Sequence, residues 1–231
     1  MADSPNLNTG KLVTYAVYST GKKVADTLRF VSIEVYHEVN RIGGATLKLF
    51  AGDMPKGDIP ESASNDFKPG QEIKIEMGYE NTNTPVFTGI VVSHRIMIPK
   101  GEGASPMLVV ECKDLAIRAT VGRKNQVFEK KTDKQAISTV LGDAGLSVEV
   151  DATSTTHTQL LQYYSTDWDF ALSRADACGL VVITDGKKVT VKKPNVSASA
   201  VLKLTYGSDM ISFDGELYAE DQLLVRRFGK L

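Results

Sequence analysis

The stretch QLLQYYSTDWDFALSRADACGLVVITDGKKVTVKKP, residues 159–194, carries the clearest structural signals in the sequence. Thr166, with Asp169 three residues later, is typical of a helix N-cap, because hydroxyl and carboxylate oxygens accept hydrogen bonds from the free N–H groups of a first turn. Trp168 begins an apolar stripe at helical spacing, and Gly179 can adopt the left-handed conformation that ends many helices. The pattern predicts a helix near residues 167–178 with Trp168 buried.

The same stretch contains a hairpin signal. Residues 180–184 and 188–192 are rich in β-branched side chains and flank the dipeptide Asp185-Gly186. This dipeptide strongly favours the tight turn between two antiparallel strands. We therefore expect a helix followed directly by a β-hairpin.

The first half of the chain alternates strand-like segments with turns. The strand-like segments are residues 11–18, 28–37, 45–50, 72–79, 86–98 and 106–113. Their β-branched and aromatic content, with partial period-two alternation, indicates a small antiparallel barrel or sandwich. Residues 52–70 contain three of the eight prolines and show no periodicity, which is typical of a long surface loop.

The organisation changes near Gly122. From Thr132 onward the apolar residues follow helical spacing until Gly145, which predicts a second helix near 133–144. We expect a strand at 147–150, a Thr-rich link at 153–158, and further strands near 200–206 and 210–216. The predicted fold class is mainly β with two or more short helices (α+β), built as two packed β-barrel-like subdomains over residues 1–121 and 122–231.

Composition argues against several classes of function. The 231 residues include 42% hydrophobic ones, enough for a core, and 27 basic residues nearly balance 28 acidic ones, giving a formal net charge of -1. Without a basic excess, nucleic-acid binding is disfavoured. The N-terminal sequence MADSPNLNTGKL lacks the features of a signal peptide, and no window reaches the length of a membrane span, so we expect a cytoplasmic product.

Candidate catalytic carboxylates occur at the start of the predicted helix at 167–178. Asp167 and Asp169 are two residues apart, so on a helix they point apart and cannot face each other as an acid and base pair. Interaction with the positive end of the helix dipole explains them better. Gly101-Glu102-Gly103 lacks the further glycine, the lysine and the helix of a phosphate site, and is expected to be a loop tip.

The histidines and cysteines show no metal or redox spacing. His37 and His94 lie in predicted strands and His157 in the polar link, without a closely spaced pair. Cys112 and Cys178 are far apart and are expected to be buried thiols, and a nucleophilic Cys112 would need a histidine brought near by the fold. We predict no catalytic residue, no metal and no cofactor.

Two groups of side chains suggest binding surfaces. The aromatic residues Tyr163, Tyr164, Trp168 and Phe170 could form a sugar-binding platform, although packing in a core or a subunit interface is the favoured interpretation. Short basic clusters occur at residues 122–124, 130–131 and 187–188, each offset by nearby acids and so typical of a solvated face.

Five further segments, in this order, complete a family resemblance. They are NRIGGATLKLFAGD (40–53), FKPGQEIKIEMGY (67–79), VFTGIVVSHRI (86–96), LVVECKD (108–114) and VGRKN (121–125). With residues 159–194, the ordered set resembles the hub portion of the VgrG (valine-glycine repeat protein G) family, which is related to phage baseplate hub and late control D proteins. The resemblance covers roughly residues 10–218, and its specificity lies in the order of the pieces, since each alone is a common strand and turn pattern.

The resemblance implies a structural role and no enzymatic one. Such hubs are homotrimers that cap the hexameric tube of a contractile injection machine, of the type VI secretion or phage-tail kind, and connect it to the puncturing tip. The implied partners are the tube protein, baseplate proteins, a needle or spike tip, and effectors. Assembly would be cytoplasmic, followed by delivery through contraction without a signal peptide.

The resemblance also suggests a docking surface and shows one departure. We expect charged loop residues Arg123, Lys124, Lys130 and Lys131 to contact an acidic rim of the tube. Typical members continue into an oligonucleotide-binding-type barrel and a β-helix needle, which we expect to be absent because the sequence ends at Leu231. The sequence leaves open whether it is part of a longer protein, a hub with a separate needle polypeptide, or a short member. A carbohydrate- or surface-binding β module, and a hub carrying an unrecognised lytic activity, stay as alternative functions.

Overall fold

The computed structural model describes residues 12–52, 57–100, 105–208, 210 and 212–216. Residues 12–196 form one compact unit, and the described residues from Ser197 onward belong to another. The expected division into domains 1–121 and 122–231 stays a prediction. The larger unit holds two hydrophobic cores, and residues 115–120 pack in the second of them.

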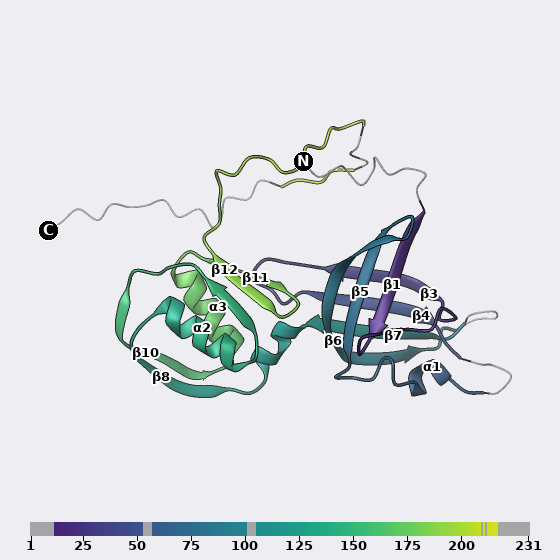
Figure 1. Ribbon diagram of the computed structural model, residues 1–231, viewed down its shortest axis with the longest axis horizontal. Coiled ribbons are helices and arrows are strands. Elements are labelled where there is room, and N and C mark those ends of the chain that lie inside the picture. Colours follow the sequence, from purple (N-terminus) through teal and green to yellow (C-terminus); the bar gives the residue numbers. More distant parts are fainter. Residues whose placement is uncertain (1–11, 53–56, 101–104, 209, 211, 217–231) are drawn as a thin grey trace. The chain divides into compact units, whose positions relative to one another are not determined.

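The first core is enclosed by a seven-stranded antiparallel sheet (Figure 1). Its strands are β1 (Val13–Ser19), β2 (Lys22–Lys23), β3 (Phe30–Tyr36), β4 (Gly44–Phe50), β5 (Glu72–Tyr79), β6 (Thr82–Met97) and β7 (Met107–Asp114). They are hydrogen-bonded in the order β2-β1-β5-β6-β7-β4-β3. The strands form because alternate apolar side chains can all point to one face of the pleated sheet.

The alternation is clearest in the central strands. Leu47 and Leu49 of β4 lie beside Leu108 and Val110 of β7, and all four are fully buried. The two ends of the sheet approach each other at Tyr15 and Phe30, whose rings meet edge to face with centroids 5.7 Å apart. No backbone pairing joins β1 to β3 among the described residues, so the sheet is open and the expected barrel-like subdomain is not confirmed.

The loop expected at residues 52–70 contains ordered structure. A short helix, α1 (Pro60–Ala63), begins with proline at its first turn, where the missing N–H is not needed. Phe67 is 1% exposed and packs in the first core. A single large apolar side chain therefore fixes part of this segment, against the expectation of a surface loop.

The second core lies among two helices and two small sheets. Its elements are η2 (Leu115–Thr120), β8 (Lys124–Thr132), α2 (Asp133–Asp143), β9 (Ser147–Val150), β10 (Thr156–Ser165), α3 (Asp167–Ala177), β11 (Val181–Asp185) and β12 (Lys188–Lys192). Strands β8 and β10 form an antiparallel ribbon, and the other sheet has the order β11-β12-β9, in which β12 and β9 are parallel. Figure 1 shows α2 and α3 between the ribbon and the three-stranded sheet.

The helix ends follow the capping signals of the sequence. Thr166 is the N-cap of α3, and its hydroxyl accepts a hydrogen bond from the N–H of Asp169. Helix α2 begins with a reciprocal capping box between Thr132 and Gln135, which the sequence analysis did not use. Gly179 has a φ of 66°, a conformation that glycine adopts without the steric cost of a side chain.

The link and the last strands expected in the second half differ from the structure. The Thr-rich link at 153–158 ends in β10, which begins at Thr156 and pairs with β8. The strands expected near 200–206 and 210–216 do not form among the described residues, where only an isolated bridge joins Tyr206 and Met210. Two barrel-like subdomains are not confirmed, although the mainly β class with short helices is. Within the described part of the chain, every helix is too short or too polar to cross a membrane.

Candidate functional site

The β8–β10 ribbon brings most of the predicted binding residues together. Its inner face contributes Phe128 and Leu160, which are paired across the strands and buried in the second core. The next pair, Val127 and Leu161, faces outward, with 53% and 57% of their surfaces exposed. The alternation that buries one face of the ribbon therefore leaves apolar side chains on the other.

The four basic residues expected to contact a tube occupy different settings. Three of them, Lys124, Lys130 and Lys131, lie in β8 and not in a loop. Arg123 directly precedes β8, and its guanidinium covers the Tyr164 ring at 5.1 Å and donates to the Tyr164 carbonyl oxygen at 3.1 Å. This contact holds Arg123 against the start of the ribbon.

Lys124 is paired within the fold. Its Nζ lies 2.5 Å from Oδ2 of Asp167, whose carboxylate is almost fully buried at the start of α3. The second oxygen of Asp167 accepts from the amide of Gln162 at 3.0 Å. Asp167 therefore has a structural role beyond the expected helix-dipole interaction. Of the four predicted basic residues, Arg123, Lys130 and Lys131 have no ion-pair partner among the described residues.

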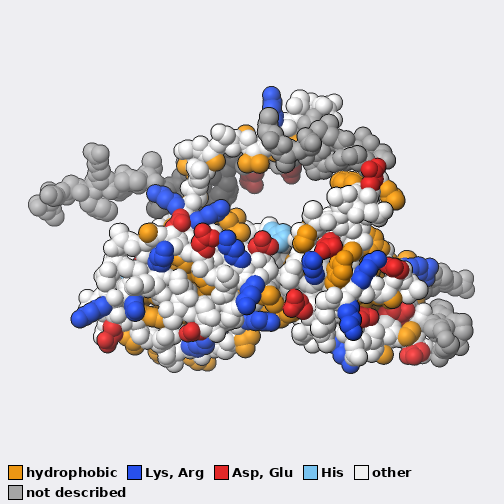
Figure 2. Space-filling view, viewed as in Figure 1, with side chains coloured by type: hydrophobic (Ala, Val, Ile, Leu, Met, Phe, Trp, Pro, Cys, Tyr) orange, Lys and Arg blue, Asp and Glu red, His pale blue; other side chains and the backbone are white. Residues whose placement is uncertain are grey.

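Charge is unequally divided between the two strands of the ribbon. Strand β8 carries Lys124, Glu129, Lys130 and Lys131, whereas β10 contains no lysine, arginine, aspartate or glutamate. Figure 2 shows basic and acidic side chains interspersed over the face that it presents.

The backbone of the ribbon is strained at two residues. Lys130 has a φ of 49° and Tyr164 a φ of 45°, values that are sterically unfavourable for a residue with a side chain.

The predicted aromatic platform does not form as a group of four. Tyr163 and Tyr164 are 76% and 63% exposed, but Trp168 is only 7% exposed and Phe170 stacks on Phe128 inside the core, with ring centroids 5.6 Å apart. The sequence interpretation that these rings pack in a core is thus confirmed for Trp168 and Phe170. The two tyrosines add to the exposed face of the ribbon.

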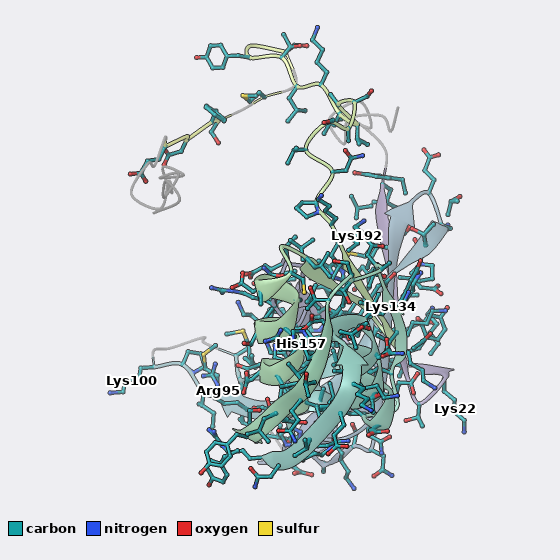
Figure 3. The ribbon with its side chains drawn as sticks, turned by 90° about the vertical axis from the view of Figure 1, so that its left-hand side faces the viewer. Lys22, Arg95, Lys100, Lys134, His157 and Lys192 are labelled. Carbon is teal, nitrogen blue, oxygen red and sulfur yellow. The ribbon has the colours of Figure 1, made fainter. Side chains whose placement is uncertain are left out.

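A buried carboxylate on α2, which the sequence analysis missed, links three elements. Both oxygens of Asp133 are used: Arg174 of α3 donates to Oδ1 through two nitrogens at 2.7 and 2.6 Å, and His157 Nε2 of β10 lies 2.8 Å from Oδ2. Burial raises the pKa of Asp133, but the hydrogen bonds from His157 and Arg174 outweigh it and hold the pKa below the usual 3.8. Figure 3 labels His157, which the sequence analysis had placed in a polar link.

A second buried carboxylate joins the two cores. Asp114 ends β7, accepts from the N–H of Ala116 at 2.9 Å and accepts from the N–H of Gly186 at 2.7 Å. Burial raises its pKa, partly offset by these two hydrogen bonds. The Asp185-Gly186 turn forms as the sequence predicts, and Gly186 has a φ of 59°.

The remaining sequence candidates stay apart. Burial raises the pKa of Cys112 to about 12, so its thiol stays protonated at neutral pH and is a poor nucleophile. Cys178 is half-buried, not fully buried as expected. His37 and His94 bond to the carbonyl oxygens of Val86 and Phe67.

The described residues contain no group of three or more histidine, cysteine or acidic side chains that could hold a metal ion. Lys188 pairs with Glu149 at 2.8 Å. The expected loop tip at Gly101-Glu102-Gly103 lies outside the described residues.

Comparison with known proteins places this arrangement in a family. A family model described as the Alg8 N-terminal domain matches residues 9–226. The chain belongs to the Alg8 N-terminal domain family. No curated protein sequence matches it.

Several solved structures share the fold of this chain. The 43 kDa tail protein of prophage MuSo2 from Shewanella oneidensis superposes with a TM-score of 0.59 at 13% identity, over 78% of this chain and 53% of that protein. The tail protein of Neisseria meningitidis gives 0.58 at 15% identity, over 82% and 53%. An Escherichia coli component of the type VI secretion system, described as similar to bacteriophage T4 tail proteins, gives 0.55 at 12% identity, over 75% and 48%.

These similarities define the fold. This chain has the fold of two tail proteins and a type VI secretion component, which agrees at this level with the family resemblance seen in the sequence. The chain spans about half the length of the solved structures that it matches.

Proposed function

We propose that this chain is a structural hub of a contractile injection machine, of the phage-tail or type VI secretion kind. Three copies form a homotrimer that caps the hexameric tube and connects it to a puncturing tip. The observation that carries this proposal is the fold shared with a prophage tail protein, a second tail protein and a type VI secretion component. The ordered sequence resemblance to VgrG hubs supports the same role.

The role is mechanical and needs no catalytic centre. The two carboxylates with the most unusual surroundings, Asp114 and Asp133, use their oxygens in hydrogen bonds that join elements of the fold. These hydrogen bonds involve both oxygens of each carboxylate and hold each group in place within the fold. We therefore assign them to stability.

Symmetry sets a requirement on docking. A three-fold assembly matches a six-fold ring only if each chain offers two docking surfaces. In this proposal the two are supplied by the two β-rich parts of the chain, before and after about Gly122, as two barrel-like subdomains of the tail-hub kind. The β8–β10 ribbon belongs to the second part.

The ribbon suits contact with an acidic tube rim. Arg123, Lys130 and Lys131 bring unpaired positive charge to an apolar outer face that contains Val127 and Leu161. Such a surface, apolar at the centre with charges around it, resembles the general composition of protein interfaces. Lys124 belongs to the same proposed set, although its charge is already paired with Asp167. Baseplate proteins, the spike tip and effectors would be further partners, met during cytoplasmic assembly and delivery by contraction.

The test separates assembly from docking. Light scattering at micromolar concentration measures whether the chain is a trimer, and cosedimentation with the hexameric tube protein of the same machine measures docking. The variant Arg123→Glu, Lys130→Glu, Lys131→Glu should lose docking while the trimer persists, because exposed ion pairs at the rim would be reversed. The triple variant Lys134→Glu, Lys192→Glu, Lys193→Glu makes the same change in net charge at exposed residues outside both the first β-rich part and the ribbon, and should dock normally. A strictly monomeric wild type that fails to cosediment would contradict the hub.

A further inference from the structure

Strand β10 is an edge strand without the charged side chains or proline that usually discourage pairing, and its bulge lies only at its C-terminal end, between Gln162 and Ser165. Among the described residues its only strand neighbour is β8. Its ten residues, THTQLLQYYS, contain no lysine, arginine, aspartate, glutamate or proline. Proteins generally place such residues on edges because a free row of N–H and C=O groups can pair with another chain.

The other strand of the ribbon shows the contrast. Strand β8 also has a free edge, but it carries Lys124, Glu129, Lys130 and Lys131. The unprotected edge is therefore β10 alone within this ribbon. Leu161 and Tyr163 are exposed on β10, so the surface beside the free edge is apolar as well. Figure 1 shows β10 with β8 on the outside of the helices.

The chain also contains a strand-forming segment without a strand partner. Residues 201–206, VLKLTY, alternate so that Leu202, Leu204 and Tyr206 would share one face. In the structure these residues form no strand apart from the isolated bridge of Tyr206, and all six are exposed. A turn in which Ser208 N–H donates to the Thr205 carbonyl oxygen ends the segment.

We propose that residues 201–206 of one copy add as a strand to the β10 edge of a second copy. The two segments are compatible in charge, since β10 has no charged residue and the added strand has only Lys203, so pairing places no like charges opposite each other. Backbone hydrogen bonds would hold the added strand to β10, and packing of the apolar side chains would set the register between the two strands. The inference rests on the proposed homotrimer and names one contact that holds it together.

The geometry of such an exchange fits a closed ring. Each copy donates one segment and accepts another at a different surface, which is a head-to-tail contact, and rotation by a third of a turn closes it. Residues 193–200 connect β12 to the added strand. Extended chain covers about 3.3 Å per residue, so these eight residues span at most about 26 Å.

Crosslinking between separately prepared proteins tests the contact. Leu161→Cys and Leu204→Cys are made one per protein, each with Cys178→Ser, and are mixed at micromolar concentration before mild oxidation. Because the two cysteines are on different molecules, a disulfide between the two variants arises only from contact between copies. We expect this disulfide, and we expect none when Leu161→Cys is mixed with Val196→Cys. A disulfide that forms only when both cysteines are on one chain, at low concentration, would overturn the proposal in favour of pairing within a copy.

A charge on the edge strand provides the second readout. Leu161→Lys should raise the dissociation constant of the trimer about tenfold or more, because the added charge lies at the paired edge. Val127→Lys changes the cross-strand neighbour of Leu161 on β8 and should leave the constant nearly unchanged. A stable trimer without the mixed disulfide would contradict strand addition and leave the hub proposal standing, whereas a monomer at every concentration would contradict both.

Discussion

The carboxylate of Asp114 accepts a 2.7 Å hydrogen bond from the backbone N–H of Gly186, a residue 72 positions further along the chain. Gly186 turns the β11–β12 hairpin, and Asp114 ends β7, so the bond joins the seven-stranded sheet to the second core. Nearby, Asn40 N–H donates to the Val182 carbonyl oxygen and its side chain accepts from Val182 N–H. The two cores are therefore connected by directional bonds made between buried or half-buried groups.

Replacing Asp114 with asparagine should weaken this connection. The carboxylate accepts from two N–H groups, and an amide offers only one oxygen, so one N–H would face an NH₂ group. We expect a loss of about 1–3 kcal/mol in the free energy of unfolding, measured by urea denaturation at neutral pH. Asp185→Asn, at the exposed neighbouring position, should change the free energy far less. Equal effects would show that the Gly186 contact contributes little.

The pKa of Asp133 predicts a dependence of stability on pH. Its folded-state pKa is lower than 3.8, so its ionised form stabilises the protein above that value, and this contribution is lost as the pH falls through the folded-state pKa. Asp133→Asn should cost about 2–3 kcal/mol at neutral pH and flatten the decline in acid, because Arg174 and His157 lose a charged acceptor. Urea denaturation from pH 3 to pH 7 measures both. A parallel decline in the two proteins would contradict the assignment.

Removal of the Trp168 side chain should be among the most damaging single changes. Trp168 is 7% exposed in the second core, and truncating a buried large aromatic costs about 3–5 kcal/mol. Trp168→Ala should therefore lower the melting temperature clearly, as followed by circular dichroism. Tyr163→Ala removes an exposed ring from the neighbouring strand and serves as the control. Unchanged melting of Trp168→Ala would mean that the indole is exposed in solution.

Charge reversal at two lysines of β8, Lys124 and Lys130, should affect the stability of the fold differently. Lys124→Glu places a carboxylate beside the buried Asp167, so we expect it to destabilise the fold by at least about 1–2 kcal/mol. Lys130→Glu changes an exposed residue with no ion pair among the described ones, and stability should stay within about 0.5 kcal/mol. Urea denaturation of the two variants measures this difference. A variant that keeps its stability can then be used in docking measurements without disturbing the fold.

Local signals in the sequence predicted the local structure well. The cap at Thr166 and the turn at Asp185-Gly186 depend on residues within a few positions of each other, and both form. The mainly β class follows from the β-branched content of the first half. For the cap and the turn, the stabilising contacts are nearly adjacent in the chain, so composition and spacing are sufficient to find them.

Long-range contacts account for the failures. Asp133, His157 and Arg174 come from three elements, and no short motif announces that they meet. Strand β10 begins with Thr156 and His157, whose polar side chains are typical of a link. They form a strand because they pair with β8, a contact that the local sequence does not indicate. Conversely, residues 201–206 have the composition of a strand, but composition alone supplies no neighbour to pair with.

The parallel pairing of β9 with β12 sets the order in which the two cores can fold while the chain is being synthesised. The seven strands of the first sheet all lie between residues 13 and 114, so that sheet can be completed while the remainder of the chain is still being translated. Strand β9, by contrast, can pair with β12 only after β12 has been synthesised, and β10, α3 and β11 lie between the two strands in the sequence. On a ribosome, the second core can close only after Lys192 has left the exit tunnel, onto a surface that is already folded.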